Sequence, residues 1–75
     1  MTRLVDCKEN TQVKIVNINA GRGAVMNLSN LGLHIGNIIQ FIRKSPFKGP
    51  VVVIFQGCEV AIGYGLAQKI FVEKI

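Results

Sequence analysis

The stretch Val51–Ile62 limits most strongly how this chain can fold. Five strand-forming residues, Val51–Phe55, are followed by Gln56-Gly57 and then by a second apolar run, Cys58–Ile62. Two turn residues ending in glycine, placed between two such runs, are typical of a β-hairpin. The sequence therefore predicts that an antiparallel hairpin forms here, and the rest of the fold has to accommodate it.

Three further segments show the two-residue alternation of strands. They are Thr11–Ala20, Ile38–Lys44 and Ile70–Ile75. Because neighbouring side chains of a strand point to opposite faces, each segment has one face for the core. The residues expected to share an inward face are Val13, Ile15 and Asn17 in the first segment, and Cys58, Val60 and Ile62 in the hairpin.

One segment has a different rhythm. Ala24–Leu31 places apolar residues three and four positions apart, which predicts a short helix with a single apolar stripe. Gly32 follows as a left-handed helix stop, so that Leu33 can fold back on the last turn. The stripe consists of Val25, Leu28 and Leu31.

Five short strands, one short helix and a helical turn at Gly65–Lys69 make the chain mainly β. Its 75 residues, 49% of them hydrophobic, suffice for one domain with one core, spanning residues 1–75. An open sheet of this size would leave edges free and faces uncovered, so we expect a small β-barrel.

The charges are unevenly distributed. The acids lie towards the two ends, whereas the segment between Glu9 and Glu59 contains bases only. With a net charge of +5, such a chain favours an acidic protein face, an anionic membrane surface or nucleic acid. Phe47 and Tyr64 are the only rings expected at the surface, too few for a stacking platform, so nucleic acid is not the expected partner and a basic nucleic-acid-binding barrel stays the weaker alternative. The bases of this segment are Lys14, Arg22, Arg43, Lys44 and Lys48.

The residues that could carry chemistry are few. His34 is the only histidine, and no serine, threonine or carboxylate pair has the spacing of a catalytic group, so no enzyme is predicted. No cofactor is assigned. An alternative that stays open is a divalent transition metal, iron or zinc, held by His34, Cys7 or Cys58, or shared between two protomers of a homo-oligomer. In the default interpretation, both cysteines are reduced thiols.

Ser45–Pro50 contains both prolines of the chain. Because proline fixes φ, Pro46 and Pro50 should hold a rigid loop that projects Phe47 and Lys48. A stiff connector that only sets the strand register is the other interpretation of this loop.

The chain shows neither a membrane-spanning run nor the apolar region of a signal peptide. We therefore expect an unprocessed cytoplasmic protein that does not insert into the membrane.

The ordered pattern from residue 30 onward, NLGLHIGNIIQFIRKSPFKGPVVVIFQGCEVAIGYGLAQKIFVE, resembles the FeoA family, the small cytoplasmic component of bacterial ferrous iron uptake. The pattern combines a Leu-Gly-Leu helix end with a strand opened by glycine, a basic strand end and a proline-rich loop. The residues that carry it are Leu31 to Leu33, Gly36, Arg43 to Pro50, Gly57, Val60 to Ile62, Ala67 and Ile70 to Glu73.

The resemblance implies an SH3-like barrel without enzyme activity. It also implies a partner, the FeoB-type membrane transporter with its cytoplasmic G-protein domain; the same barrel is a C-terminal domain of iron-responsive repressors. The family often has arginines in the short helix where this chain has Met26, Asn27 and Ser29, so a helix-side contact would be apolar here. The residues expected to contact the partner are Met26, Leu33, Arg43, Lys44, Phe47 and Lys48.

Overall fold

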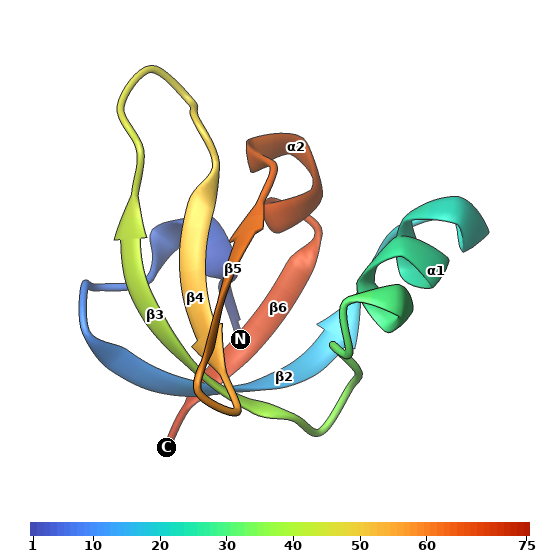
Figure 1. The fold of residues 1–75 in the computed structure, drawn as a ribbon, viewed down its shortest axis with the longest axis horizontal. Coiled ribbons are helices and arrows are strands. Elements are labelled where there is room, and N and C mark those ends of the chain that lie inside the picture. Colours follow the sequence, from blue (N-terminus) through green and yellow to red (C-terminus); the bar gives the residue numbers. More distant parts are fainter.

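A six-stranded antiparallel sheet, curled into a small barrel, makes up most of the molecule (Figure 1). The computed structural model describes residues 1–75, and the strands follow the order β1-β6-β2-β3-β4-β5. The predicted class, a mainly β, SH3-like barrel with one short helix and a helical turn, is confirmed. The elements are β1 (Thr2–Arg3), a 3-10 turn (Leu4–Asp6), β2 (Thr11–Ile18), α1 (Arg22–Asn30), β3 (Ile38–Lys44), β4 (Val51–Phe55), β5 (Cys58–Ile62), α2 (Tyr64–Ala67) and β6 (Ile70–Lys74).

Five of these strands were expected, and four of them have the predicted bounds or differ by one residue, whereas β2 ends two residues earlier than predicted. The sixth, β1, consists of two residues that pair with Val72 and Phe71 of β6. Nothing in so short a segment distinguishes a strand from a loop, because β1 is a strand only through its partner. The β4–β5 hairpin turns at Gln56-Gly57 as predicted, with Phe55 opposite Cys58.

Two irregularities in pairing curl the sheet. The register shifts between Ile15 and Asn17 where β2 pairs with β6, and between Phe41 and Arg43 where β3 pairs with β4. An extra residue on one strand bends it and increases its twist, which helps a short sheet close on itself. The first shift also explains why Asn17 is exposed instead of sharing the inward face of Val13 and Ile15.

The core is one cluster drawn from almost every element. Phe41 is the largest side chain in it, and its neighbours along β3 and β4 are aliphatic. No polar or charged side chain is buried, so the core rests on apolar packing alone. The cluster comprises Leu4, Val5, Val13, Ile15, Leu28, Leu33, Ile39, Phe41, Val51, Val53, Ile62, Ala67, Ile70 and Val72.

Helix α1 ends as predicted. Gly32 has φ +87° and donates its N–H to the carbonyl of Ser29 at 2.9 Å, while Leu33 donates to the carbonyl of Leu28 at 2.8 Å. This pair of bonds is the Schellman motif, which needs a left-handed residue and hence favours glycine. Its accompanying apolar contact brings Leu33 into the buried cluster with Leu28.

Three expectations about burial were wrong. Of the predicted helix stripe only Leu28 is buried, and Val25 and Leu31 are exposed, because α1 lies beside the barrel past the end of β2 and not across it (Figure 1). Cys58 is exposed because it is the first residue after the hairpin turn, at the end of the barrel. Tyr64 is half-buried and packs against the core.

Candidate docking surfaces

Exposed large apolar side chains include those at two separate places next to the short helix and on the proline loop, besides Met1, Ile38 and Ile75. One surrounds α1 and the turn that follows it, where Val25, Met26, Leu31 and Ile35 are exposed. The other is the β3–β4 loop, Ser45–Pro50, which carries Phe47. In Figure 1 the loop extends beyond the barrel at the upper left, whereas α1 lies at the right. The two places therefore do not form one face.

The first place contains an open hollow of about 370 Å³, which we call the α1 hollow. Its walls come from α1, from the end of β2 and from the turn after the helix. That turn is held by two bonds: Gly36 donates to the carbonyl of Ile15 at 2.7 Å, and Ile15 donates to the carbonyl of Asn37 at 2.9 Å. The lining residues are Ile18, Val25, Ser29, Leu33, His34 and Ile35.

The turn is also braced from within. The Asn37 side-chain oxygen accepts a hydrogen bond from the His34 N–H at 2.6 Å, and the Asn37 N–H donates to the His34 carbonyl at 3.1 Å. Both backbone groups of His34 are thereby satisfied, and the side chains of His34 and Ile35 remain exposed at the edge of the hollow. The hollow is thus a preformed apolar surface with one titratable residue.

The second place is a tight and strained turn. Gly49 donates to the carbonyl of Pro46 at 3.1 Å, which closes a turn around Phe47 and Lys48. Both central residues have φ +57°, a left-handed conformation that is unfavourable for an aromatic residue. The Phe47 side chain is 100% exposed, so no contact within the chain compensates for this strain.

Close approach of the two arms explains the glycine in this loop. A Cβ on Gly49 would lie 2.7 Å from the Cβ of Ser45. The N–H of Ser45 meanwhile donates to the carbonyl of Pro50 at 3.0 Å. Prolines, a close-packed glycine and two backbone bonds together restrict the backbone of the loop.

Bases without partners surround the loop. Arg43, Lys44 and Lys48 are exposed, and the only ion pair of the structure joins Arg3 to Asp6 at 3.0 Å, elsewhere on the barrel. The positive charges of the loop are therefore available to an external anion.

The residues expected to contact a partner divide between these two places. Arg43, Lys44, Phe47 and Lys48 lie together on β3 and the loop, and Met26 lies on α1, 65% exposed. Leu33 is a correction: it forms the floor of the α1 hollow at 1% exposure, because the Schellman motif turns it inward. It supports the surface and cannot itself be an exposed contact.

The metal candidates are not brought together. Cys7 lines a different hollow near the N-terminus, His34 lines the α1 hollow, and Cys58 stands at the β4–β5 turn. No group of three or more histidine, cysteine or acidic side chains in the chain could hold a metal ion. The predicted set therefore does not form a site within one chain.

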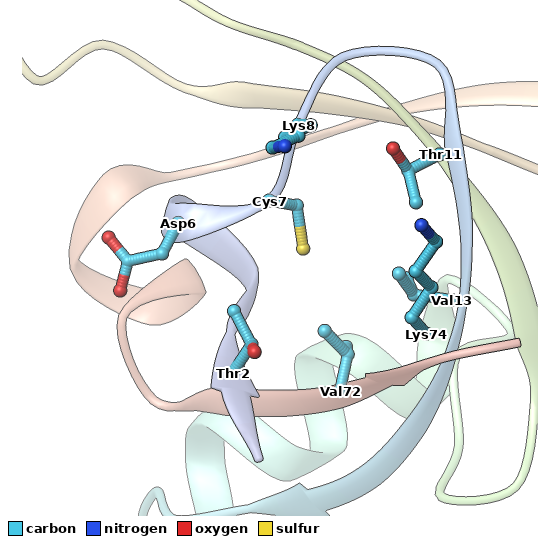
Figure 2. Close-up of a pocket in the computed structure, with 8 residues that line it drawn as sticks. All are labelled: Thr2, Asp6, Cys7, Lys8, Thr11, Val13, Val72 and Lys74. Carbon is cyan, nitrogen blue, oxygen red and sulfur yellow. The ribbon is translucent and has the colours of Figure 1, made fainter.

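Figure 2 shows the hollow around Cys7, about 280 Å³ in volume. The thiol points into the hollow between Thr2 and Thr11, whereas the carboxylate of Asp6 points away. Burial raises the pKa of the Cys7 thiol, and the negative charge of Asp6 raises it further. Because the thiolate is the nucleophile and the metal ligand, this cysteine is a poor candidate for either role.

Comparison with known proteins decides the family. A model of the FeoA domain matches residues 2–74. This chain belongs to the FeoA family. The FeoA family is a family of small transport-associated proteins and not a known enzyme family.

Relatives agree in sequence and in fold. The chain is 41% identical over 73 residues to the "Putative Fe(2+) transport protein A" of Methanocaldococcus jannaschii, covering 97% of this chain and 87% of the relative. The crystal structure of an iron uptake regulatory protein, FeoA, is 32% identical with a TM-score of 0.84, covering 97% of this chain and 95% of that one. The regulator ScaR with bound Zn²⁺ is 25% identical with a TM-score of 0.91, covering 100% of this chain and 37% of ScaR.

Some of the α1 hollow escaped the sequence analysis. Ile18 and Ile35 were not singled out, and Val25 was placed in the apolar stripe of the helix. One signal was available in the sequence. The segment around α1 has more apolar residues than a helix of this length can bury, because the three stripe residues and the adjacent isoleucines would all need cover. The hollow around Cys7 left no such signal, since it joins residues from both ends of the chain.

Proposed function

We propose that this protein is a non-enzymatic accessory protein of ferrous iron uptake that docks, through its α1 hollow, on the cytoplasmic part of a FeoB-type transporter. The observation that carries the proposal is a preformed apolar hollow, lined in part by the exposed Ile35 and with the exposed Met26 on the same helix, in a chain of the FeoA family. No helix of the structure has the length and apolar character to cross a membrane. Iron is in this proposal the cargo of the transporter.

The chemistry of the hollow indicates what it would bind. Its lining is apolar apart from Ser29 and His34. An apolar side chain from a partner helix or loop would fill it, as in other helix-and-groove contacts. Met26, exposed on α1, would add a second contact, because its unbranched thioether side chain adapts to irregular partners. Burying one such side chain stabilises a complex by about 1.5–3 kcal/mol.

Amide NMR tests the proposal. Isotope-labelled protein is titrated with the soluble G-protein domain of the transporter, and shifts should concentrate in α1 and in residues 33 to 37. Ile35→Ser should weaken binding at least about tenfold, since truncating an apolar side chain that a partner buries costs roughly 2 kcal/mol.

Ile75→Ser is the matched control. Ile75 is 63% exposed and Ile35 is 61% exposed, but Ile75 lies at the end of the chain, outside the hollow. It should bind like the unaltered protein. Shifts confined to other elements, or equal loss in both variants, would contradict docking through the α1 hollow.

A further inference from the structure

We propose that the β3–β4 loop is a lipid-contacting tip, which places the Phe47 ring in the interface of an anionic bilayer while Arg43, Lys44 and Lys48 bind the headgroups. This goes beyond docking on a transporter and does not depend on it. It also departs from the expectation that the chain does not insert into the membrane, because one side chain, Phe47, would enter the bilayer interface.

The shape of the tip is the first argument. Phe47 is fully exposed on a convex turn that extends beyond the barrel (Figure 1), so it has no apolar neighbour to shield it from water. An aromatic ring beside lysines and arginines is the usual composition of segments that lie in the membrane interface. Pro46 and Pro50, both exposed, add uncharged surface on either side of the ring.

The charges select the kind of bilayer. Arg43, Lys44 and Lys48 have no ion-pair partner in the chain, and although Glu9 precedes the neighbouring strand β2, it forms no ion pair with Arg43. Each base near an anionic surface strengthens binding about fivefold. The complementary surface is therefore an anionic bilayer and not a neutral one.

The backbone of the loop suits a poorly hydrated environment. An unsatisfied N–H is costly where water is scarce. Of the residues from Ser45 to Pro50, the two prolines have no N–H, and Ser45 and Gly49 already donate to Pro50 and Pro46 within the loop. Only the N–H groups of Phe47 and Lys48, at the apex, have no acceptor within the chain. Lipid phosphates can accept hydrogen bonds from them.

The strain of the turn is the last argument. Two non-glycine residues with φ +57° persist although the ring contacts nothing in the chain. Strained backbone of this kind concentrates at functional sites, where it presents a side chain in a fixed orientation. A ring held outward in advance loses little conformational freedom when it binds.

Vesicles test the proposal without any transporter. The probe is the full chain with vesicles of phosphatidylcholine, alone or with one third phosphatidylglycerol, at low salt. Because the chain contains no tryptophan, Phe47→Trp introduces a single tryptophan at the tip, which can be excited selectively. Its emission should shift to the blue with the anionic vesicles only, and Ile75→Trp, at an exposed site elsewhere, should not shift.

Co-sedimentation gives the magnitudes. Phe47→Ala should lower the partition coefficient for anionic vesicles about tenfold, and Lys44→Gln about fivefold. Lys14→Gln, an exposed base on β2, is the charge control and should have a smaller effect.

Three results would overturn the proposal. They are the absence of binding to anionic vesicles, binding that Phe47→Ala leaves unchanged, and equal losses in Lys44→Gln and Lys14→Gln, which would indicate general charge attraction. If the unaltered protein does not bind vesicles and Phe47→Ala loses binding to the G-protein domain, the tip would contact a protein pocket instead of a bilayer. None of these results bears on Ile35→Ser, so this proposal and docking through the α1 hollow can fail separately.

Discussion

The two reversals that flank β4 solve the same geometric problem differently. At the β4–β5 turn, Gln56 and Gly57 have φ +50° and +79°, and Phe55 and Cys58 pair directly beside them. At the β3–β4 loop, Phe47 and Lys48 have φ +57° each, at the end of a longer projection. Both reversals place two left-handed residues at the apex, as type I′ turns do, but only one of them uses glycine.

The difference separates connection from presentation. Two residues with glycine suffice to join antiparallel strands, as β4 and β5 show. The β3–β4 loop is longer, has two non-glycine residues with positive φ, and holds a phenylalanine in water. Neither feature improves the pairing of β3 with β4, so the exposed Phe47 is what a contact role of the loop would use. The stiff connector that only sets the strand register stays the other interpretation of this loop.

The largest expected effect is on the free energy of unfolding, and it should distinguish Phe41 from Phe47, which belong to the same β3–β4 hairpin. Phe41→Ala removes the largest ring of the core and should lower the free energy of unfolding by about 3–5 kcal/mol. Phe47→Ala should change it by less than about 0.5 kcal/mol, because the ring contacts nothing in the chain. Urea denaturation followed by circular dichroism measures both. Similar losses would mean that the loop packs on the barrel in solution.

Exchanging the apex residues of the two turns tests the strain. Lys48→Gly should stabilise the protein by about 1 kcal/mol, because glycine adopts a positive φ without strain. Gly57→Lys should destabilise it by about 1–2 kcal/mol, although no atom lies within 4 Å of the added Cβ.

Gly63→Ala is the control for this exchange, since Gly63 has φ −56° and also has open space around it. It should be neutral or slightly stabilising. A destabilising Lys48→Gly would contradict a strained tip.

The smallest effect concerns the two thiols, one in the N-terminal hollow and one beside the β4–β5 turn. The pKa of Cys7 is raised by burial and by Asp6, so the unfolded chain releases this proton at a lower pH than the folded chain. The protonated Cys7 therefore contributes to the free energy of unfolding. This contribution is fully present below about pH 8.5, the pKa of a free thiol, and is lost as the pH rises through the pKa of the folded state. Cys7→Ala should abolish that part of the alkaline decline.

Thermal unfolding of the unaltered protein and of Cys7→Ala, between neutral and alkaline pH, measures how much of the alkaline loss of stability depends on Cys7. Cys58→Ala is the matched control, since Cys58 is exposed. The same alkaline decline in unaltered protein and in Cys7→Ala would contradict the pKa shift.

Local chemistry made much of the fold predictable. Strand alternation, the Gln56-Gly57 turn and the glycine stop at Gly32 each depend on a few adjacent residues, so their positions could be derived without coordinates. The rigid projection of Phe47 was predictable for the same reason, because proline and glycine act on the backbone where they stand.

Long-range packing decided the rest. Which helix residues are buried depended on where α1 meets the barrel, so Leu28 entered the core while Val25, with Ile35 of the following turn, became the rim of a hollow. The shifts in pairing that expose Asn17 and the strand that Thr2–Arg3 forms exist only through their partners. The sequence by itself therefore determined five of the six strands, the helix α1 and the turns between them, which follow from neighbouring residues. Only the tertiary structure decided which apolar side chains face outward, because burial depends on residues far apart in the chain.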